Sequence, residues 1–207
     1  MEQKPMTERE SLEVIQQMIF AAKVEQKDDG KGWIIWGWLI FAASVFTIFN
    51  ISFEWHSSTF FFWNLFGIIT LIFFFIQIAM YLFGKKISRV KTYTKDLFDK
   101  LNTGFFLSLM LIIISINVGV PPTKGFALLL GLYGFWILIY GAVLNFKPSI
   151  IGAYITWIFA FASLFAPDFM WTMILHAGAV MAGYIIPGHI ANIEFNKLNK
   201  EAIKKGV

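Results

Sequence analysis

Residues 126–144 decide the fold: they read FALLLGLYGFWILIYGAVL and contain no charged side chain. An amphipathic helix of a water-soluble protein needs a polar face, and a helix formed by this stretch has none. Its length is close to the 20 or so residues that a helix needs to cross roughly 30 Å of hydrocarbon. The stretch therefore predicts a membrane-spanning helix whose natural solvent is lipid.

The composition extends this interpretation to the whole chain of 207 residues. Hydrophobic residues make up 57% and charged residues only 14%, whereas a soluble domain carries about 25% charged residues. This excludes an ordinary water-soluble globule. The polar stretches are shorter than the ~50 residues that a separate domain needs. We therefore expect one membrane domain at 32–186, an N-terminal segment at 1–31 and a C-terminal helical tail at 187–207.

Long apolar runs recur six times along the chain. They cover residues 32–51, 59–83, 104–120, 125–143, 149–165 and 169–186. Pro148 stands where the fifth run opens, and Pro187-Gly188 predicts the end of the sixth. The fold that we predict is an all-α transmembrane bundle of six spans, with amphipathic helices on its cytoplasmic side.

The positions of the Lys and Arg residues predict the orientation of the bundle. Of the 17 basic residues, only Lys124 falls in an odd-numbered connection, and the others lie in the two terminal segments and the even-numbered connections. By the positive-inside rule, both termini are then cytoplasmic. This partition explains the net charge of +4 without a nucleic-acid partner.

Three polar segments on the predicted cytoplasmic side carry apolar residues at helical spacing. In segment 1–31, Thr7 and Glu10 have the spacing of a capping box, and Leu12, Ile15 and Ile19 follow as a stripe. The second connection and the tail repeat the pattern. Such helices either lie on the membrane surface or bind a protein partner, and the sequence leaves both interpretations open.

All Asp, Glu, Lys and Arg residues lie outside the six spans. Ion-driven pumps usually place such a charge within the membrane, a retinal-type Schiff base needs a Lys there, and an aspartyl intramembrane protease needs paired carboxylates. These classes are therefore disfavoured. The chain also has no Cys, which excludes disulfides and Cys-based metal sites. We predict no cofactor and no catalytic residue.

His176 is the ionisable residue deepest in a span apart from Tyr, about 12 Å from the outer end at 1.5 Å per residue. One interpretation is a neutral imidazole bonded to a neighbouring helix. The other groups it with polar residues of the outer half that would line an outward-facing pocket. These are His56, Glu54, Asp168, Asn50, Asn64 and Asn117. Glu54 and His56 are metal-ligand types, but no spacing such as HExxH accompanies them, so no metal is predicted.

Small and aromatic residues predict how the spans pack. Ala179 with Gly183, and Gly134 with Gly141, make small-residue faces that should contact other helices closely. Whether these helices belong to the same chain or to a second copy is left open, so a homo-oligomer stays one of the partner hypotheses. Trp63 is expected in the aromatic belt at the outer boundary.

Several short motifs resemble a known group of proteins in their order and spacing. They are Ser11-Leu12-Glu13, Trp36-Gly37-Trp38, Phe146-Lys147-Pro148 with Ile151-Gly152, and Ile186-Pro187-Gly188. Together they resemble an uncharacterised family of small six-span membrane proteins of Bacteroidetes-type bacteria. The resemblance implies a location in the bacterial inner membrane and supplies no catalytic or binding residue.

Three classes of function remain. The first is a non-enzymatic membrane protein that regulates or scaffolds a partner through its cytoplasmic helices. The second is a small permease, a channel or the membrane subunit of a transporter. The third is a membrane enzyme that uses the outer polar residues, and it requires them to converge.

Overall fold

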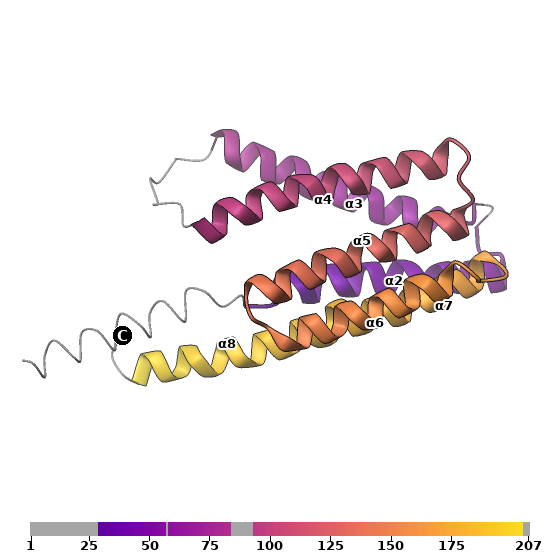
Figure 1. Cartoon of the computed structure of the whole chain (residues 1–207). Coiled ribbons are helices and arrows are strands. Elements are labelled where there is room, and N and C mark those ends of the chain that lie inside the picture. The colour runs from indigo at the N-terminus through magenta and orange to yellow at the C-terminus, as the bar shows by residue number, and fades with distance from the viewer. Residues whose placement is uncertain (1–28, 57, 84–92, 205–207) are drawn as a thin grey trace, which may run out of the picture.

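The computed structural model describes residues 29–56, 58–83 and 93–204. Within these ranges the chain is helical apart from short turns (Figure 1). The elements are α2 (Lys31–Phe53), α3 (Phe61–Phe83), α4 (Tyr93–Asn117), α5 (Pro122–Val143), α6 (Lys147–Ser163), α7 (Phe169–Val180), the π-helical turn η1 (Met181–Ile185) and α8 (Ile186–Lys204). The predicted amphipathic helix that starts near Thr7 lies outside the described residues.

Each predicted apolar run falls on a helix. Four helical segments are long and apolar enough to cross a membrane: Lys31–Phe53, Lys100–Asn117, Pro122–Val143 and Phe169–Glu201. The apolar stretch Phe61–Phe73 of α3 is shorter, and α6 has 17 residues. The chain is thus an all-α protein with several candidate membrane spans, and the predicted all-α class is confirmed.

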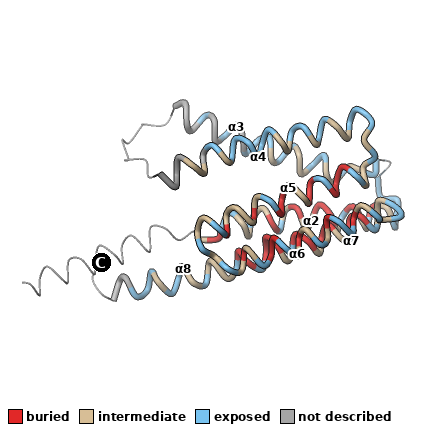
Figure 2. Tube along the Cα trace, in the orientation of Figure 1, coloured by how far each residue is buried: buried red, intermediate tan, exposed pale blue. Residues whose placement is uncertain are grey.

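The buried core lies among α2, α5, α6 and the continuous α7–η1 segment, where the buried residues gather in Figure 2. Leu130, Ile137 and Val180 are at most 1% exposed there. Outside this core, α3 packs on α2 and α4 packs on α5. The membrane-spanning window of α4 contains no buried residue. Helices α3 and α4 therefore lie outside a core of four helices (Figure 1).

Glycines permit the closest approaches in this core. A Cβ atom on Gly152 of α6 would lie 2.6 Å from the Ala182 carbonyl oxygen of η1, and one on Gly183 would lie 2.5 Å from Thr156 Oγ1. A Cβ on Gly37 of α2 would lie 2.9 Å from the Ile185 side chain. Only hydrogen atoms fit at these positions, so α2 and α6 both approach η1 closely. The close packing predicted for Gly183 is confirmed.

The sequence predicted that the sixth helix ends at Pro187-Gly188, and this is wrong: both residues lie within α8, which continues to Lys204. Proline has no N–H, and in a regular α-helix its ring collides with the carbonyl four residues back. The widened turn η1 precedes Pro187 and removes this conflict: the Ile186 N–H bonds to the Met181 carbonyl, five residues back. The π turn therefore lets the helix accommodate proline and continue.

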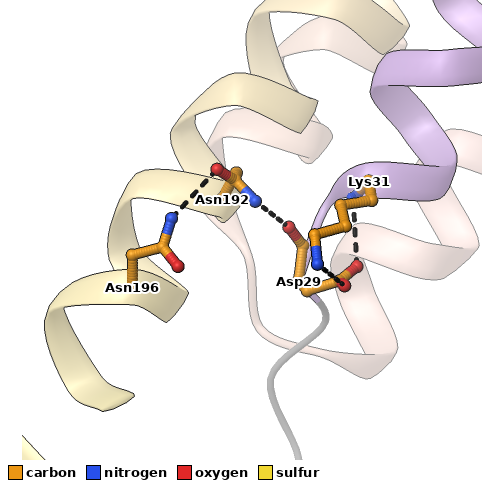
Figure 3. A network of polar contacts seen from close by, with 4 residues as sticks. All are labelled: Asp29, Lys31, Asn192 and Asn196. Atoms are coloured by element: carbon orange, nitrogen blue, oxygen red, sulfur yellow. Dashed lines mark hydrogen bonds and ion pairs between the residues drawn. The ribbon is translucent and has the colours of Figure 1, made fainter. Parts of the chain in front are cut away.

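A small polar network joins the start of α2 to α8 (Figure 3). The Asn192 side-chain amide donates to the Asp29 carbonyl at 2.8 Å, and the Asn196 amide donates to Asn192 Oδ1 at 3.1 Å. The Asp29 carboxylate accepts from the Lys31 N–H at 3.0 Å. Gly30, with a φ of 69°, turns the chain here against Gly188. This network holds the middle of α8, at Asn192 and Asn196, beside the first residues of α2.

The Gly152→Ala substitution tests the contact with η1. We expect it to lower the free energy of unfolding by about 1–3 kcal/mol, the usual cost of overpacking, because the methyl group collides with backbone. The matched control is Gly131→Ala on α5, where the new Cβ would find its nearest neighbour, Trp157, at 3.9 Å. Unfolding in mixed micelles with increasing SDS measures both. Equal stability of the two variants would contradict the close contact.

Candidate functional site

His176 lies at the centre of the site, on the face of α7 that packs against α2. Its side chain is fully buried, and its Nδ1 atom lies 3.1 Å from Ser44 Oγ of α2. Ser44 is itself 0% exposed. A hydrogen bond between two helices in the buried core is the arrangement that one of the two sequence interpretations predicted for this histidine.

Three aromatic rings surround the imidazole. Their centroids lie 5.1 Å (Trp63), 5.7 Å (Phe126) and 6.0 Å (Tyr133) from that of His176, all at steep interplanar angles. Edge-to-face contacts of this kind add to the packing energy of the rings. The imidazole is therefore hydrogen-bonded to Ser44 and is also in contact with aromatic rings from α3 and α5.

Trp63 is a residue of the site that the sequence interpretation missed, because it was expected to serve as a boundary anchor. In the structure its indole Nε1 donates to Met173 Sδ at 3.1 Å, and Met173 is fully buried. Met173 and His176 are three residues apart and share one face of α7, which is a visible signal. That α3 supplies the third member of the group depends on the packing of helices and has no sequence signature.

The hydrogen-bond pattern selects a tautomer of His176. Ser44 Oγ donates its single proton to the Ile40 carbonyl at 2.9 Å, so it accepts from the imidazole. Nδ1 then carries the proton and Nε2 presents a lone pair. Among the described residues, His176 Nε2 and Ser163 Oγ are the buried side-chain polar atoms without a hydrogen-bond partner. The site thus contains one unused acceptor in an aromatic pocket.

Asn50 in the last turn of α2 and His56 in the loop after it, two of the residues predicted to accompany His176, are joined by a hydrogen bond. The buried Asn50 side chain donates to the Ser58 carbonyl at 3.0 Å and accepts from the His56 backbone N–H at 2.8 Å. The exposed His56 ring stacks on Phe61 with the centroids 3.9 Å apart. Asn50 therefore organises the α2–α3 loop.

The remaining four candidates are exposed. Glu54 has a φ of 50° in the turn after α2. Asp168 caps α7, where its carboxylate accepts from the Trp171 N–H at 3.0 Å. The Asn117 amide donates to the Ile113 carbonyl of its own helix at 2.8 Å, and Asn64 lies near the start of α3.

The candidates differ in their hydrogen-bond partners. Asn50 and His56 share a hydrogen bond, whereas the hydrogen bond of His176 is to Ser44 of α2 and those of Asp168 and Asn117 stay within or beside their own helices. Within the described residues, no three His, Cys, Asp or Glu side chains are grouped so that they could hold a metal ion.

Buried hydroxyl groups accompany the site along α2, α6 and α7. Thr47 donates to the Ala43 carbonyl at 2.7 Å, and Thr156 lies 2.8 Å from the Gly152 carbonyl and 3.4 Å from that of Ala179. Each hydroxyl donates a hydrogen bond to the backbone carbonyl of a helical residue. Polar groups in a non-aqueous interior must find such partners within the protein.

Comparisons with known proteins identify no relative. No family model, no curated protein and no solved structure matches the chain.

The Ser44→Ala substitution tests the bond to His176. We expect a loss of about 0.6–2 kcal/mol in the free energy of unfolding, the range for hydrogen bonds between membrane helices. Ser115→Ala is the matched control, because its hydroxyl is only partly buried and donates to the Leu111 carbonyl of its own helix. A double-mutant cycle with His176→Phe in SDS-titrated micelles isolates the pair. Additive effects of Ser44→Ala and His176→Phe would contradict an energetic link between the two side chains.

Proposed function

We propose that this chain is a non-enzymatic, six-span protein of the bacterial inner membrane, with cytoplasmic termini, that regulates or scaffolds a protein partner. The observation that carries the proposal is the length of the continuous helix α7–η1–α8. It spans 33 residues from Phe169 to Glu201, which corresponds to about 50 Å at 1.5 Å per residue. The hydrocarbon core of a bilayer is only about 30 Å thick.

The distribution of charge along this helix supports a membrane exit near His189. From Phe169 to Ile193 the sequence contains no Asp, Glu, Lys or Arg, and charged residues then begin with Glu194 and continue with Lys197, Lys200 and Glu201. If the first 20 or so residues cross the hydrocarbon, the rest of α8 projects from the cytoplasmic face. Figure 1 shows α8 extending past the ends of α5 and α6.

The projecting part of α8 presents an apolar residue beside these charges. Ile193 is 56% exposed, and the hydrogen bond from Asn192 to Asp29 holds this part of α8 against the start of α2. A firmly held helix with apolar and charged groups on its exposed surface suits the binding of another protein. The partner function is therefore assigned to α8.

The bonds of the outer polar residues support the non-enzymatic part of the proposal. Asn50 bonds to the α2–α3 loop, Asp168 caps α7, and His176 bonds to Ser44. Each side chain thus has a structural task. The resemblance to six-span bacterial proteins agrees with the proposed number of spans and location.

The topology is tested with single cysteines, which the natural chain lacks. Ser58→Cys lies in the exposed outer loop and Asn196→Cys on exposed α8. With a membrane-impermeant maleimide, we expect intact spheroplasts to label Ser58→Cys alone and inverted vesicles to label Asn196→Cys alone. The reverse pattern would overturn the orientation, and labelling of both from one side would overturn the proposed separation of the two positions by the membrane.

Photo-crosslinking in native membranes tests the partner. A benzoyl-phenylalanine in place of Ile193 should give one discrete heavier band, identified by mass spectrometry as another protein. The same residue at Ile158, which is 67% exposed within α6, is the control and should give lipid adducts. Because the crosslinker sits at a single position, a protein adduct at Ile193 shows both that a partner binds and that it binds at α8.

Two results would contradict the proposal. Absence of a protein adduct at Ile193 would leave α8 without the proposed task. Protein adducts of equal yield at Ile193 and at Ile158 would show that the crosslinked proteins do not bind α8 in particular. Stability of each variant in SDS titration shows that the helices are intact.

A further inference from the structure

An apolar groove runs along the outside of the bundle between α5 and α6. It is an open groove with a volume of about 380 Å³, and its lining includes Ala127, Gly131, Phe135, Trp157 and Leu164. This volume lies within the range of roughly 300–1,000 Å³ that is typical of small-molecule sites. The lining residues belong to the apolar middle and outer parts of the two helices, so the groove opens toward the region that we assign to lipid.

Gly131 is responsible for the depth of the groove. A Cβ atom there would meet only Trp157, at 3.9 and 4.0 Å, which is ordinary contact. One turn further along α5, a Cβ on Gly134 would lie 2.7 Å from the same indole. The Trp157 ring therefore closes the space beside Gly134 and leaves space open beside Gly131.

A cation stands at one end of this groove. Lys124 is in the first turn of α5, and its ammonium group donates a hydrogen bond to the Leu164 carbonyl of the groove lining. An ammonium group has three N–H donors, so two remain for a ligand. The positive end of the α5 helix dipole lies at the same place.

We propose that the groove binds an anionic phospholipid, with one acyl chain along Gly131 and Trp157 and the phosphate on Lys124. The order of the chemistry along the groove matches such a molecule: an apolar channel for a hydrocarbon chain, followed by a single positive charge at the helix end. Lys124 is also the one basic residue that the charge partition places at this end of the bundle. The proposal does not depend on the function assigned to α8.

Native mass spectrometry of the full chain, after exchange into equal amounts of phosphatidylglycerol and phosphatidylcholine, tests this site. The wild type should retain one phosphatidylglycerol with a preference of about fivefold, the value expected for one Lys near an anionic headgroup. Lys124→Gln should abolish the preference, because glutamine keeps a donor for Leu164 and loses the charge. Gly131→Leu should abolish retention of either lipid, because leucine fills the groove.

Two matched variants control for general effects. Lys147→Gln removes a cation at the other end of α6, and Gly67→Leu adds leucine on α3, where a Cβ would have nothing within 4 Å. Both should behave as the wild type. Unaltered stability of Gly131→Leu in SDS titration shows that the groove, and not the fold, was changed.

Three outcomes would overturn the proposal. They are equal retention of both lipids by the wild type, equal loss in Lys147→Gln and Lys124→Gln, and a wild-type dimer that Gly131→Leu converts to a monomer. The last result would assign the groove to a second copy of the chain.

Discussion

Hydrocarbon supplies no hydrogen bonds, and this constraint governs the structure. Every backbone N–H and C=O within a span must find its partner in the protein, which a helix provides along its own length. The same rule applies to side chains: Thr47 and Thr156 return their hydroxyl protons to carbonyls of their own helices. The buried polar groups of this bundle are tolerated because the helices supply acceptors at the right spacing.

Helices in lipid gain little from apolar contact alone, so they associate through close packing. Gly37, Gly152 and Gly183 bring α2, α6 and η1 into van der Waals contact of their main chains and nearest side-chain atoms. This proximity places Ser44 within reach of His176. The imidazole site and the glycine contacts are thus parts of one packed unit, with the aromatic rings of α3 and α5 filling the space that the glycines do not close.

Much of the architecture could be predicted because hydrophobic runs of span length are a strong local signal. Each of the six runs falls on a helix, and four helical segments are long and apolar enough to cross a membrane. The small residues predicted close contacts such as that of Gly183. The site was less predictable, because Trp63 meets His176 only through the packing of α3 against α2 and α7. Asn50 was grouped by its depth, which does not show that its amide closes a loop. Pro187 was misinterpreted because a π turn has no simple sequence signature.

The π turn determines the direction in which each face of α8 points about the helix axis. An α-helix advances by about 100° and 1.5 Å for each residue, and a π bulge adds one residue to the path of the helix. Loss of one residue from η1 would therefore rotate all of α8 by about 100° relative to α7 and redirect Ile193 to another quadrant. A point insertion or deletion in this turn is a simple route by which related chains could reorient their projecting helix while the membrane core stays the same.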